Sequence, residues 1–153
     1  MKSTLAALVL TMTAAPAAYA QEMTVTKADS LEGQIGAAET FTGTAYVAPV
    51  FGANVHDVSA GHVTFLPGAR SAWHTHPAGQ QLVVTSGTGW TQERNGEKHI
   101  IQAGDVVWCP PGVEHWHGAT DTTSMSHYAI QAKVDGSAVA WGAQVTDEEY
   151  HGH

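Results

Sequence analysis

The chain has 153 residues, a formal net charge of −8 and a single cysteine, Cys109. The excess of acidic residues argues against nucleic acid and anionic membrane surfaces as partners. Because one cysteine allows no internal disulfide, stability must come from the core, from a bound metal or from association between copies of the chain.

Residues 1–20 have the features of a secretion signal. Lys2 supplies a positive start, residues 5–12 are apolar, and residues 18–20 form a small-x-small cleavage site. The apolar run is well short of the roughly 20 residues that span a bilayer, and no later segment is long enough. We therefore expect export, to a bacterial periplasm, with a mature chain that begins at Gln21.

The rest of the chain is expected to be one all-β domain, residues 41–153, preceded by a polar arm, residues 21–40. Short β-prone runs separated by Gly and Pro are typical of a sandwich or barrel. The predicted strands are 43–48, 60–66, 72–76, 80–85, 89–94, 97–101, 105–109, 114–118 and 124–131. Asn95-Gly96 predicts a type I′ hairpin, and Ser86-Gly87 another turn. Near the end, residues 145–150 predict a short helical turn with Thr146 as its N-cap.

Two segments carry histidines in positions that suit a metal. Side chains alternate along a strand, so His74 and His76 face one way and Trp73 faces the other. Gln80 follows a short turn that can bring its amide oxygen beside the two imidazoles. His115, just after a Pro-Pro-Gly turn, would complete a set of four ligands. Ten histidines in so weakly charged a chain also indicate metal or proton chemistry.

These residues resemble the two motifs of the cupin family. The first motif, G-x5-H-x-H-x3-E-x6-G, is matched by Gly68, His74, His76, Gln80 and Gly87, with Gln in place of the usual Glu. The second, G-x5-P-x-G-x2-H, is matched by Gly104, Pro110, Gly112 and His115, although Ala119 replaces the Asn that usually closes it. The resemblance implies a single-domain cupin jelly-roll β-barrel with a divalent transition metal held by His74, His76, Gln80 and His115.

A neutral Gln ligand leaves the charge of the metal uncompensated and should make it a stronger Lewis acid than a centre with Glu. Imidazole with oxygen admits Mn(II), Fe(II), Co(II), Ni(II) or Zn(II), so the ligand types do not identify the metal. Four protein ligands would leave two positions of a six-coordinate ion open, which suits catalysis.

Two further histidines are expected to face the barrel interior. His117 shares its face with His115, and His127 shares a face with Met125 and Ala129. Near a metal their rings could accept a proton, as catalytic bases, or could orient the ligands through hydrogen bonds.

A closer resemblance extends over residues 41–44, 70–77, 104–108, 115–119, 125–131 and 145–148. These runs are similar to the small manganese cupins that include bacterial hydroxynitrile lyases, which cleave cyanohydrins to an aldehyde or ketone and cyanide. The resemblance implies Mn(II), an active-site role for His127, and His117 nearby. Ser71, where a Thr is typical, and the secretion signal depart from the group and put the substrate in doubt.

The expected function is therefore a metal-dependent lyase acting on a small organic molecule. A metal-dependent dioxygenase and a non-catalytic module that captures a small ligand at the metal are alternatives, because one fold hosts many functions. The apolar tryptophans and the polar arm make a homo-oligomer reasonable.

Overall fold

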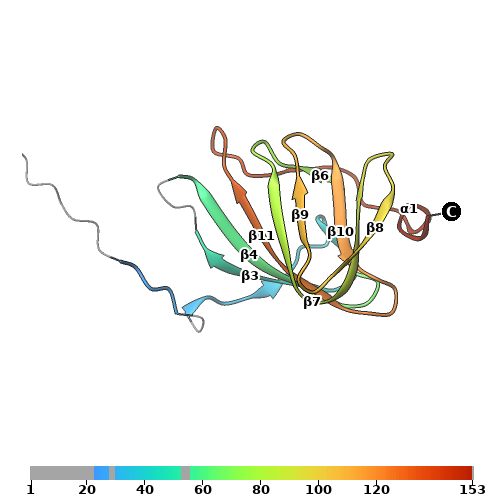
Figure 1. The fold of residues 1–153 in the computed structure, drawn as a ribbon, viewed down its shortest axis with the longest axis horizontal. Coiled ribbons are helices and arrows are strands. Elements are labelled where there is room, and N and C mark those ends of the chain that lie inside the picture. Colours follow the sequence, from blue (N-terminus) through green and yellow to red (C-terminus); the bar gives the residue numbers. More distant parts are fainter. Residues whose placement is uncertain (1–22, 28–29, 53–55, 153) are drawn as a thin grey trace, which may run out of the picture.

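The strands of the protein form a strongly curled antiparallel sheet (Figure 1). The computed structural model describes residues 23–27, 30–52 and 56–152, so the predicted signal at 1–20 lies outside the described residues. The described elements are β1 (Gln34–Ile35), β2 (Phe41–Thr42), β3 (Ala45–Phe51), β4 (Val58–Phe65), β5 (Arg70–Ser71), β6 (His74–Thr75), β7 (Gln80–Glu93), β8 (Lys98–Gln102), β9 (Val106–Cys109), β10 (His115–Ala119), β11 (Met125–Ala132), β12 (Ala140–Trp141) and α1 (Asp147–His151). Within this part of the chain, no helix is long and apolar enough to cross a membrane.

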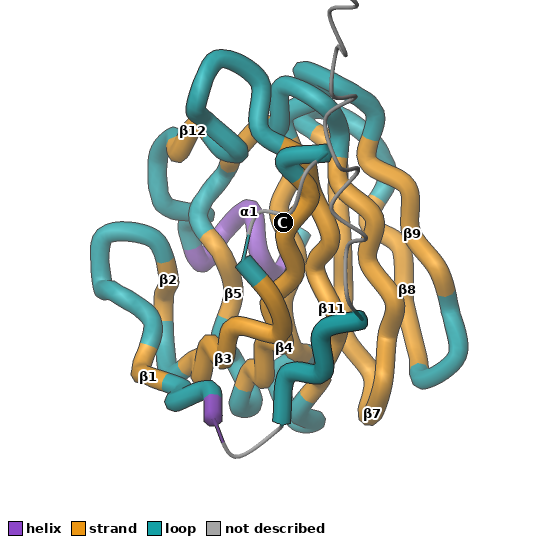
Figure 2. Tube along the Cα trace, turned by 90° about the vertical axis from the view of Figure 1, so that its left-hand side faces the viewer, coloured by secondary structure: helices purple, strands orange, loops and turns teal. Residues whose placement is uncertain are grey.

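One long strand, β7, belongs to both halves of the barrel. Its first half pairs with β11 and β9, and its second half pairs with β10 and β8. The sheet order runs β1-β3-β4-β11-β7-β10-β5-β2, and the sheet curls strongly between these two edge strands (Figure 2). The all-β cupin-type barrel expected from the sequence is confirmed.

The predicted turn at Ser86-Gly87 is wrong. Strand β7 continues through it, and these two residues bend the strand instead of ending it. Gly87 has φ 73°, and a Cβ there would lie 1.9 Å from the carbonyl oxygen of Ser124, so only glycine fits. A register shift between Ser126 and His127 on the partner strand marks the same bend.

Four other local predictions had different outcomes. Of the strand expected over 72–76, only His74–Thr75 forms one, β6, and the separate strand β5 lies before the predicted range. The Asn95-Gly96 hairpin is present, but it is not type I′, because only Asn95 of the pair has a positive φ. The helical turn is confirmed, since Thr146 accepts a hydrogen bond from the Glu149 amide in a complete capping box. The segment expected as an arm contributes β1, which pairs with β3.

Two apolar clusters lie on opposite sides of β10. One fills the barrel and includes Phe65, Val84 and Met125. The other lies outside the barrel and packs Trp73, Trp116, Val145 and Tyr150 together beneath α1. Strand β10 therefore directs His115 and His117 inward while Trp116 anchors the C-terminal segment on the other face.

Candidate metal centre

The four predicted ligands come together at one end of the barrel. His74 begins β6, Gln80 begins β7 and His115 begins β10, while His76 follows β6 by one residue. His74 and His115 are cross-strand partners, with ring centroids 4.3 Å apart. All four side chains are buried.

Backbone carbonyls fix the orientation of the three predicted imidazole ligands. Nδ1 of His74 lies 2.9 Å from the Ala72 oxygen, and Nδ1 of His76 lies 2.7 Å from the Ala138 oxygen. Nδ1 of His115 lies 2.9 Å from the Val113 oxygen. Since a carbonyl only accepts, each Nδ1 carries the proton and each neutral ring presents a bare Nε2. Metal-ligating histidines are typically held in this way.

Gln80 supplies an oxygen to the same space. Its Nε2 donates to Oε1 of Gln131 at 3.3 Å, which directs its own Oε1 toward Nε2 of His115, 3.3 Å away. In neutral His115 this Nε2 has no proton, because Nδ1 already donates to Val113. Two acceptors therefore face each other, and a cation between them would remove the repulsion between their lone pairs.

Burial keeps these rings neutral. It lowers the pKa of His74 to about 3, with a further contribution from His115, and lowers the pKa of His76 to about 4. Burial also lowers the pKa of His115. Neutral imidazoles are the form that binds metals, so the site is prepared for a cation near neutral pH.

His117 lies close enough to belong to the same cluster. One ligand atom from each of His74, His115 and His117 lies within 4.8 Å of the other two. Nε2 of His117 and Nε2 of His76 are both buried without a hydrogen-bond partner among the described residues. Such unpartnered nitrogens are costly unless another group uses them, and a cation or a bound hydrogen-bond donor would do so.

Behind His117 lies His127. Nδ1 of His117 and Nε2 of His127 are 3.0 Å apart, so the two buried rings share one proton between these atoms. Burial lowers the pKa of His127 to about 4 and holds the pKa of His117 well below its ordinary range. The main-chain N–H of His117 donates to the hydroxyl of Ser71, so the Ser that departs from the family pattern helps to fix this strand.

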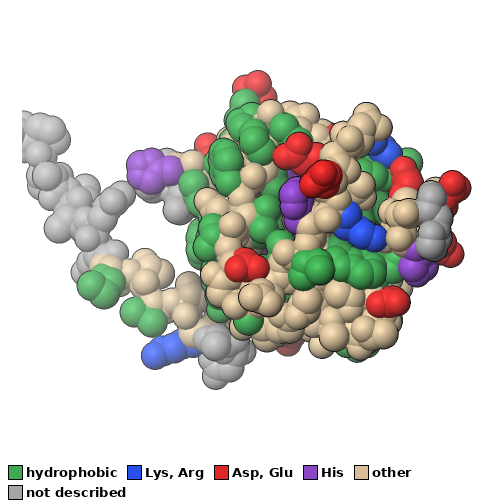
Figure 3. Space-filling view, turned by 45° about the vertical axis from the view of Figure 1, so that its right-hand side comes forward, with side chains coloured by type: hydrophobic (Ala, Val, Ile, Leu, Met, Phe, Trp, Pro, Cys, Tyr) green, Lys and Arg blue, Asp and Glu red, His purple; other side chains and the backbone are tan. Residues whose placement is uncertain are grey.

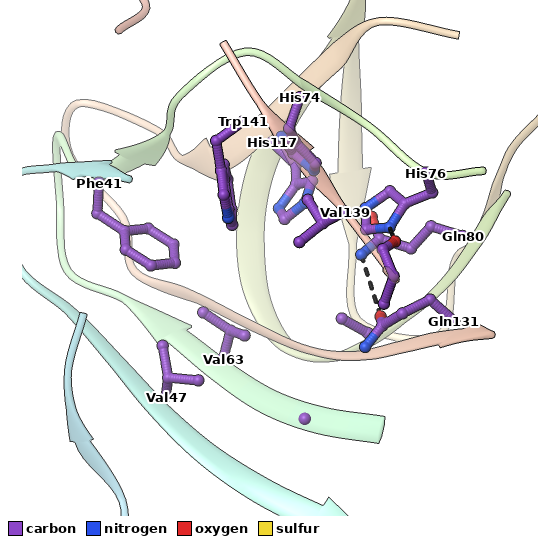
Figure 4. A pocket seen from close by; sticks show the side chains of 13 residues that line it. Phe41, Val47, Val63, His74, His76, Gln80, His117, Gln131, Val139 and Trp141 are labelled. Atoms are coloured by element: carbon purple, nitrogen blue, oxygen red, sulfur yellow. Dashed lines mark hydrogen bonds between the residues drawn. The ribbon is translucent and has the colours of Figure 1, made fainter. Parts of the chain in front are cut away.

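A cavity of about 170 Å³ opens beside the cluster, and His117 forms part of its wall (Figure 4). The polar end carries His74, His76 and Gln80, as well as Gln131. The far end is apolar and is formed by Phe41, Val47 and Val63, while Trp141 lies beside His74 and Val139 lies between His117 and His76. The cavity therefore suits a small molecule with one polar end and one apolar end.

Sequence reasoning missed part of this wall. The inward position of Gln131 could have been predicted, because it alternates in phase with Ala129 on β11. Val139 and Trp141 had none, because residues 133–146 show no period-2 pattern and reach the cavity through the two-residue strand β12, which pairs with β6.

The donor set fits a divalent transition ion. His74, His76, His115 and Gln80 would hold it, all as neutral ligands, with Nε2 of His117 near enough to join them. The ligand types do not select one metal among the first-row ions.

The comparisons with known proteins agree with this geometry. A profile of the cupin domain matches residues 61–130. An (R)-mandelonitrile lyase from Granulicella tundricola is 55% identical over 116 residues, which cover 75% of this chain and 88% of that protein. A cupin-like protein of known crystal structure from Thermotoga maritima is 40% identical, with a TM-score of 0.75, over 78% of this chain and 92% of that one. A polyketide cyclase from Streptomyces resistomycificus shares the fold alone, at 10% identity and a TM-score of 0.67, over 85% of this chain and 92% of that one. The chain thus belongs to the cupin family.

Proposed function

We propose that the protein is a metal-dependent hydroxynitrile lyase that cleaves an aromatic cyanohydrin to an aldehyde and hydrogen cyanide. The structural observation that carries this proposal is the bare, buried Nε2 of His117 at the wall of a cavity that has a metal-binding end and an apolar end. The similarity to an (R)-mandelonitrile lyase supports the same reaction class.

The cavity matches the parts of such a substrate. Phe41 and Trp141, with ring centroids 6.0 Å apart in an edge-to-face arrangement, would contact an aryl group. The hydroxyl and nitrile groups would then lie at the histidine end. The apolar walls would exclude water from the reacting atoms.

Cleavage requires removal of the hydroxyl proton while the bond between the carbinol carbon and the nitrile breaks. The bonding electron pair leaves with cyanide, which takes up a proton to give hydrogen cyanide. A divalent ion in the site supplies positive charge that makes the substrate hydroxyl more acidic. His117 would accept the hydroxyl proton at Nε2 and return it to the departing cyanide.

His127 would act through His117. For Nε2 of His117 to accept a proton, Nδ1 must carry one and donate it to Nε2 of His127. His127 is fully buried behind His117, so it would fix the tautomer and not contact the substrate. This ordering reverses the roles that the sequence suggested, in which His127 was the base and His117 its assistant.

We further propose Mn(II) as the native ion and the bacterial periplasm as the compartment, on the resemblance and the signal-like residues 1–20. A homo-oligomer is also part of this proposal. The dioxygenase and the ligand-capturing module remain weaker candidates, because the lyase relative favours neither of them.

The test is turnover of mandelonitrile by purified protein, with benzaldehyde and cyanide measured separately. Chelation should abolish the release of both products, and added Mn(II) should restore it. Activity that survives complete removal of metal, or no cyanide from fully loaded protein, would reject the proposal.

A further inference from the structure

The strand that carries His74 is weakly held against the strand that carries His115. Strand β6 has only two residues and pairs with β10 at a single position, His115 with His74. Its other neighbour is β12, which is equally short. One cross-strand pair therefore leaves the spacing of these two histidines open to small movements.

Arg94 links the residues that precede the two histidines. Its Nε donates to Oε2 of Glu114 at 2.8 Å, and one terminal nitrogen reaches Oε1 at 3.3 Å, which makes a forked contact. Its guanidinium also lies 3.8 Å above the ring of Trp73. Trp73 directly precedes His74, and Glu114 directly precedes His115.

The helix α1 adds a third partner to the contacts that Arg94 makes with Glu114 and Trp73. The other terminal nitrogen of Arg94 donates to Oε1 of Glu149 at 2.8 Å, and Nε1 of Trp73 donates to Oε2 of the same carboxylate at 3.3 Å. Glu149 is itself fixed by the capping box of α1. On this side of the molecule, basic side chains lie next to acidic ones (Figure 3).

We infer that Arg94 is a positioning residue that sets the distance between His74 and His115 and so determines the affinity of the centre for its metal. The inference rests on the metal site of the proposed function. Arg94 lies on the outer side of the wall, away from the cavity, so it touches neither substrate nor ion.

The geometry predicts an effect on metal affinity and not on overall stability. Half-exposed ion pairs contribute little to folding, and the side chains of Arg94 and Glu114 are 34% and 36% exposed. A rigid guanidinium fork nevertheless fixes direction in a way that a lysine ammonium cannot. Residues that orient metal ligands typically change affinity by about 10- to 100-fold when they are lost.

The chain offers a matched control in Lys98. Its Nζ lies 4.2 Å from the ring centroid of Trp90 and donates to the main-chain oxygen of Tyr150 at 2.7 Å. Lys98 therefore also joins a tryptophan to α1. Neither Trp90 nor Tyr150 is next to a predicted ligand in the sequence. Lys98→Met thus removes a similar contact between a tryptophan and α1 on the outer surface and leaves the distance between His74 and His115 unchanged.

The experiment measures the dissociation constant for Mn(II) from the electron paramagnetic resonance signal of the free ion, in the full chain, for wild type, Arg94→Met, Arg94→Lys and Lys98→Met. We expect Arg94→Met to weaken binding by about tenfold or more. Arg94→Lys should restore little of this loss, and Lys98→Met should bind as wild type. Glu114→Gln should weaken binding similarly, and the double variant with Arg94→Met should add little to either single change.

The outcomes separate the two proposals. Equal Mn(II) affinity in Arg94→Met and wild type, with urea midpoints confirming that both are folded, would overturn the positioning role while leaving the metal site intact. Loss of affinity to the same extent in Lys98→Met would also overturn it, since the effect would then be general loosening of α1. A wild-type chain that takes up no Mn(II) would overturn the proposed Mn(II) centre and this inference with it.

Discussion

The amide oxygen of Gln80 lies 3.3 Å from Nε2 of His115, although both atoms are acceptors when the site is neutral. The donation from Gln80 to Gln131 and the contact between His115 and the Val113 oxygen fix these roles. The fold thus brings lone pairs together and holds them there. A centre of this kind attracts a cation without neutralising its charge.

Gln80→Glu should therefore bind the divalent ion more tightly and catalyse more slowly. The carboxylate adds a negative ligand, which lowers the Lewis acidity of the ion, and it also loses the donation to Gln131. We expect turnover per bound metal to fall by roughly tenfold or more. Metal content and the metal-normalised rate of mandelonitrile cleavage test this. A variant with unchanged metal affinity and an unchanged metal-normalised rate would show that Gln80 is not a ligand.

The structure offers two candidates to join His74 and His115: His117, whose ligand atom lies within 4.8 Å of theirs, and His76, whose ring centroid lies 5.1 and 5.7 Å from their ring centroids. We expect His76→Ala to lose most of its bound metal, because His76 has the carbonyl-oriented geometry of a ligand. His117→Ala should keep its metal. Elemental analysis of both variants after dialysis decides the matter, and the reverse pattern would assign the ligand role to His117.

The sequence predicted the four candidate ligands because the turns hold them at fixed spacing and the strand alternation gives their direction. Spacing could not predict that Ser86-Gly87 bends a continuous strand, because the same residues favour a turn and only the packing against Ser124 decides between the two. The type I′ hairpin failed for a similar reason, since the four residues between β7 and β8 leave room for a turn with a single positive φ at Asn95.

The alternation of side chains along a strand could not predict which of His117 and His127 lies nearer the cavity. Both residues were expected to face inward, and both do. Alternation gives the side of the strand on which a side chain lies but not its distance from the cavity, which depends on how far β10 and β11 lie from it. The contact between Nδ1 of His117 and Nε2 of His127 shows that the rings are neighbours, and the cavity wall, which includes His117 and not His127, shows which ring is nearer the cavity.

Phe41→Leu should impair aromatic substrates selectively. Phe41 contacts the rings of Trp141 and Phe65 at the apolar end of the cavity, and an edge-to-face contact is worth about 0.5–1.5 kcal/mol. We expect KM for mandelonitrile to rise by roughly threefold to tenfold, while KM for an aliphatic cyanohydrin such as that of acetone changes little. Equal effects on both substrates would mean that Phe41 supports the fold and not the aryl group.

His117→Ala should abolish most catalysis while leaving the fold and the metal in place. A general base contributes roughly 10²–10⁴-fold in rate, so the metal-normalised rate should fall within that range. His127→Ala should lose less, since His117 remains at the cavity wall with its tautomer no longer fixed. Rates measured from pH 5 to 8 would show the difference in their pH profiles. A larger loss in the His127 variant would return the role of base to His127.

The metal-free protein should lose stability as soon as the pH falls below about 6.5. Burial lowers the pKa of His74 to about 3 and the pKa values of His76 and His127 to about 4, whereas in the unfolded chain these rings have their ordinary value of 6.5. Between these limits the unfolded chain binds protons that the folded chain does not. Each ring therefore removes up to about 1.4 kcal/mol from the free energy of unfolding per pH unit of acidification.

Urea denaturation of chelator-treated protein at pH 7.5, 6.5, 5.5 and 5.0 measures this loss. The range from 6.5 to 5.0 reports mainly the histidines. The pKa values of Glu114 and Glu149 are lowered in the folded chain, the first chiefly by its hydrogen bond to Arg94 and the second by hydrogen bonds to Thr146 and Trp73 despite burial, so their contribution is lost mainly as the pH falls below the ordinary value of 4.5. Mn(II) should raise the unfolding free energy at pH 7.5 and should do so less at pH 5.0, since protons compete with the ion for the histidines. A free energy of unfolding that stays constant from pH 7.5 to 5.0 in the metal-free protein would show that the rings are not held neutral by burial.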